Sequence, residues 1–473
     1  MGKPTGFLDY ERETAKVLPP KERIQNFNEF RIPLNKEKQK LQGARCMACG
    51  VPFCQAGMMI GGMASGCPLH NLVPETNDLV YSGNWKQAYE RLTKTHSFPE
   101  FTSRVCPALC EAACTCGLNG QSVTTKENEH GIIENAYEKG YAAAKPPRVR
   151  TGKKVAIIGS GPAGLTCAGD LAKLGYDVTI FEALHEAGGV LVYGIPEFRL
   201  PNKIVDVEID NLAKMGVTFI KDCIVGKTIS VEDLKEEGFK GIFVASGAGL
   251  PNFMNIPGEN SINIMSSNEY LTRVNLMDAA SEDSDTPVAF GKNVAVIGGG
   301  NTAMDSVRTA KRLGAERAMI IYRRSEEEMP ARIEEVKHAK EEGVEFLTLH
   351  NPIEYIADEQ GCVKQVILQK MELGEPDASG RRSPVAIPGA TETIDIDLAI
   401  VSVGVSPNPI VPSSIKGLEL GRKGTIAVDD NMESSIPMIY AGGDIVRGGA
   451  TVILAMGDGR KAAAAMNEQL QSK

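Results

Sequence analysis

The sequence predicts an α/β protein with two dinucleotide-binding domains, preceded by an α-helical domain that carries a cysteine cluster. Two glycine-rich turns lie 139 residues apart, and each follows a short apolar strand and begins a stretch with helical periodicity. Eight of the 11 cysteines fall within the 71 residues from Cys46 to Cys116. A chain of 473 residues is long enough for two or three such domains.

Composition excludes several classes of protein. The chain is 42% apolar and 23% charged, which is typical of an ordinary folded protein. Its formal net charge of −9 argues against a nucleic-acid partner, because phosphate binding needs a surplus of Lys and Arg. No apolar run approaches the roughly 18 to 20 residues that a membrane-spanning helix needs. We therefore expect a cytoplasmic protein with no nucleic-acid and no membrane partner.

The first 150 residues form a chemically distinct segment. They contain 19 Lys and Arg against 15 Asp and Glu, whereas the remaining residues contain 32 against 45. An Ala-Ala-Ala-Lys-Pro-Pro-Arg stretch at 142–148 then precedes compact apolar strands, as expected of a hinge. The first domain boundary is therefore predicted near residue 150.

The first glycine turn follows an apolar strand that starts at Lys154. Glycines at such a turn let backbone N–H groups and a helix N-terminus approach a pyrophosphate, which a Cβ would block. The next strand, 177–181, ends at Glu182, whose carboxylate suits a ribose hydroxyl. A tight turn without a ligand is the alternative. The pattern predicts a dinucleotide site made of Gly159, Gly161, Pro162, Ala163, Gly164 and Glu182.

The second glycine turn follows a similar strand at 293–297, but its second strand, 318–322, ends on two arginines. An arginine pair can hold a 2′-phosphate, which a carboxylate would repel, so this site favours NADPH over NADH. In the alternative, the arginines lie on a solvated turn facing the glutamates at 326–328. The predicted site contains Gly298, Gly300, Asn301, Thr302, Arg323 and Arg324.

A third element lies near the C-terminus. The strand at 439–441 leads to Gly443 and Asp444, and an apolar stretch with helical periodicity runs from Ala450 to Asn467. A carboxylate and free N–H groups at this point suit the ribityl or phosphate oxygens of a flavin. The small residues at 244–248 resemble the crossover of flavoproteins with two dinucleotide-binding domains, and the alternative is an ordinary buried strand and turn.

The cysteines fall into two groups. Cys46, Cys49, Cys54 and Cys67 form the first by spacing, and Cys106, Cys110, Cys114 and Cys116 form the second. Disulfides are unexpected in the cytoplasm, so metal or redox chemistry is the sharper interpretation. Only one Cys-x2-Cys pair is present, whereas zinc ribbons present two, and the staggered spacing favours iron-sulfur clusters over zinc or idle thiols.

Eight thiolates could hold two four-iron clusters, but one cysteine is poorly placed. Cys116 is only two residues from Cys114, which makes it a difficult partner in the same cluster. A ligand other than cysteine is then needed. Glu129 and His130 are both candidates, and the residues alone leave this choice open.

Five segments together resemble the small (beta) subunits of bacterial NADPH-dependent glutamate synthase. This module is shared with NADPH:ferredoxin transhydrogenase subunits and with the N-terminal part of dihydropyrimidine dehydrogenase. The resemblance runs from about Gly6 to the C-terminus. The segments are CMACGVPFC (46–54), GCPLHNLVPE (66–75), RVCPALCEAACT (104–115), GGVLVYGIPEFRLP (188–201) and YRRSEEEMPA (322–331).

The resemblance implies a two-dinucleotide-binding flavoprotein, like adrenodoxin and glutathione reductases, behind an α-helical iron-sulfur domain. From the sequence pattern we expect the cluster domain at 1–150, the FAD-binding domain at 151–288 and 405–473, and the NADPH-binding domain at 289–404. The resemblance adds Gly189, Arg199 and Thr451 to the cofactor-binding residues. A 12-residue insert, 55–66, departs from relatives that have a short spacer there.

The resemblance also implies a division of the metal ligands between two [4Fe-4S] clusters. One cluster would be held by Cys46, Cys49, Cys54 and Cys114. The other would be held by Cys67, Cys106 and Cys110, with Glu129 at a position where dihydropyrimidine dehydrogenase has a glutamine.

The function that follows from these cofactors is electron input. NADPH gives a hydride to FAD, which passes single electrons through the clusters, so no catalytic side chain is expected. The implied partner is a large (alpha) glutamate synthase subunit carrying FMN, in a hetero-oligomer that converts L-glutamine and 2-oxoglutarate to two L-glutamate. The alternatives are a subunit of an NAD(P)H:ferredoxin oxidoreductase, whose partner is ferredoxin or another flavoprotein, a disulfide reductase, and a zinc-stapled binding module.

Overall fold

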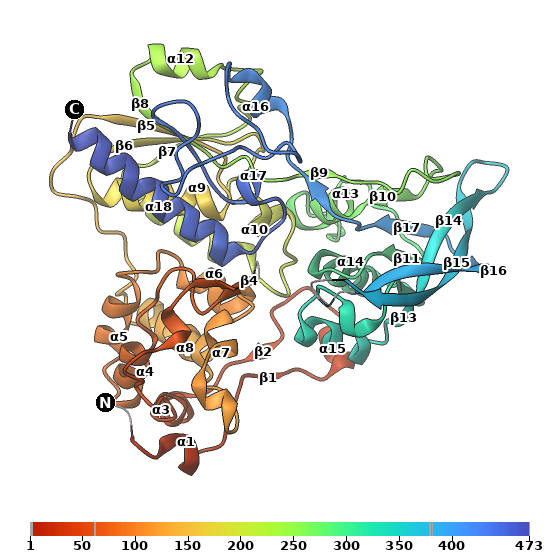
Figure 1. Cartoon of the computed structure of the whole chain (residues 1–473), viewed down its shortest axis with the longest axis horizontal. Helices are drawn as coiled ribbons and strands as arrows, with labels where there is room; N and C mark the ends of the chain where they lie inside the picture. Colours follow the sequence, from red (N-terminus) through yellow and green to blue (C-terminus); the bar gives the residue numbers. More distant parts are fainter. Residues whose placement is uncertain (1–2, 61–62, 378–379, 381, 473) are drawn as a thin grey trace.

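The computed structural model describes residues 3–60, 63–377, 380 and 382–472. It has three parts (Figure 1): a helical domain at the N-terminus, an α/β unit above it that also contains the C-terminal helix, and a second α/β unit beside them. We call these the cluster domain, the first unit and the second unit. Among the described residues, no helix is long and apolar enough to cross a membrane.

The cluster domain is built from short helices and two small hairpins. Three helices have a proline at their first or second position, where its missing N–H leaves no donor unpaired in the first turn. The hairpins are β1 (Lys16–Val17) with β2 (Arg31–Ile32), and β3 (Met58–Ile60) with β4 (Met63–Ser65). The helices are α1 (Gly6–Asp9), α2 (Pro20–Arg23), α3 (Lys36–Ala44), α4 (Val73–Tyr81), α5 (Trp85–Leu92), α6 (Pro99–Val105), α7 (Leu109–Ala112) and α8 (Thr125–Glu138), with 3-10 turns η1 (Phe53–Gln55) and η2 (Thr115–Leu118).

The first unit contains a five-stranded parallel sheet whose strands are almost entirely apolar, as expected of strands covered on both faces. Its order is β19 (Ile439–Ala441), β8 (Phe239–Val244), β5 (Lys154–Ile158), β6 (Asp177–Phe181) and β7 (Thr218–Ile220). The helices are α9 (Pro162–Lys173), α10 (Val190–Tyr193), α11 (Asn202–Lys214), α12 (Val231–Glu236), α16 (Ile410–Ser414), α17 (Asp444–Arg447) and α18 (Val452–Gln471).

The second unit repeats this plan and adds an antiparallel extension. The parallel sheet has the order β10 (Ile264–Ser266), β17 (Leu398–Val401), β11 (Asn293–Ile297), β12 (Arg317–Tyr322) and β13 (Glu345–Thr348). The extension, at the right of Figure 1, is β14 (His350–Ala357), β15 (Val363–Pro376) and β16 (Arg382–Asp395). The helices are α13 (Ser267–Leu271), α14 (Asn301–Arg312) and α15 (Ile333–Glu341), with turns η3 (Thr272–Leu276) and η4 (Glu326–Glu328).

The chain crosses between the two units through a pair of short strands. β9 (Leu250–Pro251) pairs with β18 (Val405–Ser406) in antiparallel fashion, so both crossings lie side by side. β10 precedes the domain boundary predicted at residue 289, yet it pairs with β17 of the second sheet. A three-residue strand without a glycine turn gave no sequence signal that would assign it to either sheet.

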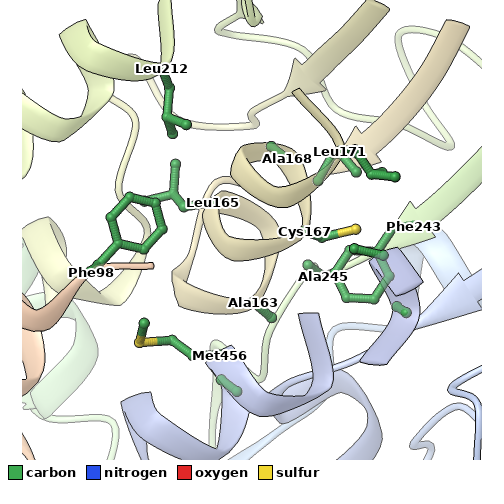
Figure 2. Close-up of a cluster of buried hydrophobic side chains, with 14 of the residues drawn as sticks. Phe98, Ala163, Leu165, Cys167, Ala168, Leu171, Leu212, Phe243, Ala245 and Met456 are labelled. Atoms are coloured by element: carbon green, nitrogen blue, oxygen red, sulfur yellow. The ribbon is translucent and has the colours of Figure 1, made fainter. Parts of the chain in front are cut away.

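One apolar core joins the cluster domain to the first unit. It includes Phe98, Phe101 and Val105 of the cluster domain together with side chains of α9 and α18. Figure 2 shows Phe98 facing Leu165 of α9 and Leu212 of α11. The two domains are therefore held in a fixed relation, which positions the cysteines against the first unit.

Candidate functional site

A single cavity of about 510 Å³ lies where the first unit, the second unit and the cluster domain meet. Val105 and Pro107, the neighbours of Cys106, line it from the cluster domain. Its volume lies within the range of cofactor sites. The predicted residues that line it are Gly159, Gly161, Pro162, Ala163, Glu182, Gly189, Arg199, Gly443, Asp444, Thr451, Asn301 and Thr302.

The glycines of the first turn have different physical roles. A Cβ on Gly164 would lie 2.0 Å from the Gly159 carbonyl oxygen, so this glycine allows α9 to pack on its strand. Gly159 has φ +99°, and a Cβ there would meet the Ala245 carbonyl. A Cβ on Gly161, by contrast, would meet no protein atom within 4 Å. The backbone at Gly161 therefore borders open space, as a site for a bound pyrophosphate requires.

The Glu182 side chain is buried, and nearby backbone N–H groups hold its carboxylate in place. Its Oε2 accepts a hydrogen bond from the Ser160 N–H at 2.8 Å, and its Oε1 accepts one from the Leu184 N–H at 2.9 Å. The Ser160 hydroxyl also binds this carboxylate and accepts a hydrogen bond from the Gly188 N–H at 2.8 Å. These contacts fix the carboxylate at the cavity wall, where it retains acceptor capacity for a ribose hydroxyl.

Two helix N-termini face the same cavity. Gly161 caps α9, and Thr451 caps α18 by accepting a hydrogen bond from the Leu454 N–H. Both caps line the cavity. Because a helix N-terminus carries partial positive charge and free N–H groups, the pair suits an anionic ligand such as a pyrophosphate.

The C-terminal Gly-Asp pair is supported by a residue that the sequence reasoning missed. Asp458 of α18 is buried, accepts a hydrogen bond from the Gly443 N–H at 3.0 Å, and binds the Arg447 guanidinium through both carboxylate oxygens at 2.7 Å. Asp444 itself lines the cavity, and burial raises its pKa to about 6. Asp458 is the only acid in the apolar stretch from Ala450 to Asn467, and this was the signal that could have found it.

The second glycine turn resembles the first in geometry. Gly298 has φ +144°, and a Cβ there would lie 2.2 Å from the Ser402 carbonyl oxygen, whereas a Cβ on Gly300 would meet nothing within 4 Å. Asn301 begins α14, and its side-chain oxygen accepts a hydrogen bond from the Arg332 N–H at 3.0 Å. Open space thus lies beside Gly161 in the first turn and beside Gly300 at the same position of the second turn.

The two arginines after β12 differ in exposure. Arg323 is exposed, whereas Arg324 is buried. The Arg324 Nε and the hydroxyl of neighbouring Ser325 are both buried without a hydrogen-bond partner among the described residues. Since buried polar groups are normally paired, these two suit an anion bound at this end of the sheet.

Arg199 links the two units. It lines the cavity, and its guanidinium binds both carboxylate oxygens of Asp305 at 2.7 and 2.8 Å and Glu335 at 3.2 Å. Although burial opposes its charge, these two carboxylates raise the pKa of Arg199 above its ordinary value. Asp305 and Glu335 were not expected from the sequence, because an acid on a helix without a motif carries no local signal.

Five cysteines of the cluster domain gather around one small cavity. It is lined by Cys46, Cys49, Cys54, Cys114 and Cys116, together with Met47 and Phe53. A hydrogen bond from Cys116 lowers the pKa of Cys114 to about 6, and burial raises the pKa of Cys54 to about 12. This outer group thus contains the four cysteines that the resemblance assigned together, with Cys116 beside them.

The other three cysteines of the cluster domain lie close enough to Glu129 to interact with its charge. Burial and this neighbouring carboxylate raise the pKa of Cys67 to about 12 and that of Cys106 to about 11, and they also raise the pKa of Cys110. Glu129 is buried on α8 and accepts a hydrogen bond from the Asn71 side chain at 3.2 Å. His130 instead contacts the Ser103 hydroxyl. We call Cys67, Cys106, Cys110 and Glu129 the inner group.

The donor set consists of free thiols and one buried carboxylate, which suits iron-sulfur chemistry. All the cysteines are free thiols. Within the described ranges, no three His, Cys, Asp or Glu side chains are arranged to hold one metal ion.

Two known protein families match separate parts of the chain. Residues 153–459 match the pyridine nucleotide-disulphide oxidoreductase family, and residues 23–141 match the family described as dihydropyrimidine dehydrogenase domain II, 4Fe-4S cluster. Two solved structures share the fold over 68% of this chain. FprA from Mycobacterium tuberculosis in complex with NADPH is 19% identical with a TM-score of 0.57 over 85% of its chain, and Lactococcus lactis thioredoxin reductase is 23% identical with a TM-score of 0.53 over its whole length.

Curated relatives are similar over the whole chain. The glutamate synthase [NADPH] small chain of Bacillus subtilis (strain 168) is 36% identical over 99% of both chains, and that of Escherichia coli (strain K12) is 35% identical over 97% of both. The glutamate synthase [NADH] of Saccharomyces cerevisiae is 34% identical over 99% of this chain, which spans 22% of that protein.

Proposed function

The chain belongs to the family of glutamate synthase small chains, and from this premise we propose that it is the NADPH-oxidising, electron-input chain of a glutamate synthase. Its electrons would go to a large chain that converts L-glutamine and 2-oxoglutarate to two L-glutamate. The observation that carries the proposal is the common cavity, which touches both glycine turns and the loop of Cys106.

The residues of the cavity would hold FAD. The open backbone at Gly161 and the N-termini of α9 and α18 suit its pyrophosphate, and the fixed carboxylate of Glu182 suits its ribose. Asp444, held beside Gly443, suits the ribityl oxygens. Bound flavin supplies the exchange between a two-electron hydride donor and one-electron acceptors.

The second turn would hold NADPH. Open space beside Gly300 suits the pyrophosphate, and the unpaired Arg324 and Ser325 suit the 2′-phosphate. Asn301 and Thr302 line the common cavity, so a nucleotide at this turn would lie beside one at the first turn.

The cluster domain would hold two [4Fe-4S] clusters. Cys46, Cys49, Cys54 and Cys114 would bind the outer one, and Cys67, Cys106, Cys110 and Glu129 would bind the inner one. The neighbours of Cys106 line the FAD cavity, so the inner group is the one placed to receive electrons. The large chain is then the partner of the outer group, and we expect it to carry FMN.

The test is spectroscopic and catalytic. We expect the anaerobically purified chain to contain one FAD and about eight iron atoms, and NADPH to bleach its flavin absorbance and produce paramagnetic reduced clusters. Adding the large chain should then restore NADPH-dependent formation of glutamate. A colourless protein without flavin and iron would refute the proposal, and so would a coloured protein that does not support glutamate formation with the large chain.

A further inference from the structure

One segment of the chain lacks charge entirely. No Asp, Glu, Lys or Arg occurs among the 29 residues from Cys46 to Pro74, although these types make up 23% of the whole chain. This segment contains half of the cluster-domain cysteines and the insert at 55–66. A surface formed by this segment therefore has no Asp, Glu, Lys or Arg side chains to make it hydrophilic.

Apolar side chains of this segment are nevertheless exposed. Six of them fall within 14 consecutive residues, with between 36% and 74% of each residue exposed. Clustered apolar exposure of this kind marks interaction sites, whereas single exposed apolar residues are normal. We call this set the apolar patch: Met47, Val51, Phe53, Met58, Met59 and Ile60.

The hairpin β3–β4 contributes the last three of these residues. Every residue of β3 is exposed, so neither face of this strand is buried by the rest of the chain. A two-stranded hairpin without a covered face is only marginally stable in water. The residues between the strands, at 61–62, lie outside the described part of the chain.

The base of the hairpin is nevertheless firmly built. The Cys67 N–H donates a hydrogen bond to the Cys54 carbonyl at 2.7 Å and closes it. Gly57 and Gly66 both have positive φ, and a Cβ on Gly66 would lie 2.4 Å from the Phe53 carbonyl oxygen. The hairpin therefore leaves the domain between the outer and the inner cysteine groups.

The patch also adjoins the outer cysteine group. Met47 and Phe53 line the same small cavity as the four outer cysteines. Those four cysteines are half-buried, as is Cys106 of the inner group, whereas Cys67 and Cys110 of the inner group are buried. The inner group adjoins the FAD cavity and the outer group adjoins the patch, which gives an order from the flavin to the surface.

We propose that the apolar patch is the surface on which the large, electron-accepting chain docks, with the hairpin β3–β4 packing against it. This inference rests on the proposed function. An electron leaving the outer group must cross to a centre held close to these cysteines, and a partner seated on the patch can bring one there because Met47 and Phe53 line the cavity of this group. Apolar interface centres rich in Met and poor in charge are typical of such contacts.

The experiment compares two variants of the holoprotein. Met58→Glu combined with Ile60→Glu places two charges on exposed positions, where folding should be unaffected. We expect the dissociation constant for the purified large chain, measured by calorimetry, to rise at least tenfold. NADPH-dependent reduction of ferricyanide, which needs no docked protein, should stay within twofold of wild type, and so should the iron content.

Phe290→Glu is the matched control, because Phe290 is equally apolar and exposed but belongs to the second unit. Its affinity for the large chain should equal that of wild type. An unchanged affinity of the double variant overturns the inference and leaves the proposed function intact. Self-association of the wild-type chain that the double variant abolishes would assign the patch to a second copy and also overturn it. A wild-type chain that fails to bind the large chain refutes the proposed function itself.

Discussion

At the scale of single residues, identical glycines serve separate purposes that only their neighbours reveal. Gly164 has a backbone oxygen 2.0 Å from its absent Cβ, whereas Gly161 has empty space there and an ordinary φ of −68°. Gly164 is thus required for folding, whereas Gly161 is required only if a ligand fills the space beside it.

We predict that Gly161→Ala lowers affinity for FAD at least about tenfold, or about 1.4 kcal/mol, because its Cβ enters the pyrophosphate site. The thermal stability of the flavin-free protein should stay the same. Flavin titration and calorimetry of the flavin-free protein measure the two effects. Gly164→Ala is the comparison, and it should destabilise the flavin-free protein directly. Full flavin affinity in Gly161→Ala would contradict the assignment.

Arg324 supports a prediction about nucleotide choice. Arg324→Glu should weaken binding of NADPH by about tenfold to a hundredfold, because a charge-assisted hydrogen bond of about 1.5–3 kcal/mol is lost. Binding of NADH, which lacks the 2′-phosphate, should change little. Titration with both nucleotides measures the ratio, and Lys240→Glu, an exposed charge reversal in the first unit, is the control. Equal losses of affinity for NADPH and NADH would show that Arg324 does not bind the 2′-phosphate.

At the scale of elements, α9 contributes both to the cavity and to the contact between the cluster domain and the first unit. Its N-terminus faces the cavity, and its flank packs against the cluster domain. Gly169 brings this flank close to its neighbours, since a Cβ there would lie 3.3 Å from Leu212 and 3.8 Å from Phe98. The helix therefore couples the flavin site mechanically to the domain that carries the cysteines.

Phe98→Ala tests this coupling. Removing a fully packed ring should cost about 3–5 kcal/mol in the free energy of unfolding. Because the lost contacts join two domains, cleavage by trypsin in the exposed linker at 142–148 should also accelerate. Phe253→Ala, at a largely exposed ring, should change neither quantity. An unchanged rate of proteolysis in Phe98→Ala would show that the two domains are not held together by this core.

At the scale of the whole molecule, a buried network of charged side chains links α2, near the N-terminus, to the second unit. Arg23 of α2 is fully buried and binds Glu342 at 2.7 Å and Glu341 at 2.9 Å. Figure 1 shows the chain running through β1 toward α15 and returning through β2. Glu342 also binds Arg308 and Arg312 of α14. Three arginines thus surround one carboxylate.

Glu342→Gln should therefore destabilise the protein by about 3–5 kcal/mol, because it leaves buried arginines without their charged partner. Burial opposes the charge of Glu342, but the arginines outweigh it and lower its pKa to about 2. The stability from this ionised group is complete above about pH 4.5, the ordinary pKa of glutamate, and is lost as the pH falls toward 2. The difference in melting temperature between wild type and variant should narrow over that range.

Glu345→Gln provides the control for this pH dependence, because Glu345 pairs with Arg317 at an exposed site. Exposed pairs contribute about 0–1 kcal/mol, so this variant should differ little from wild type at any pH. A difference for Glu342→Gln that stays constant down to pH 3 would show that the carboxylate does not act through its charge.

Much of the fold could be predicted because its signals are local. The strands that enter both glycine turns, Lys154–Ile158 and Asn293–Ile297, are where the apolar runs place them. The C-terminal helix begins at Val452, two residues after the expected start. By contrast, β10 has no local signature, and its place is set only by its pairing with β17.

The sequence by itself determined which chemistries the chain can host, because turn glycines, strand-end acids or arginines, and cysteine spacing each act through residues that are neighbours along the chain. Only the tertiary structure decided which of them meet. The common cavity, the contact of Arg199 with Asp305, the position of Glu129 among three cysteines, and the exposure of β3 all join segments far apart in sequence. Burial and pairing across such distances follow from the packing of whole elements, and no short pattern records them.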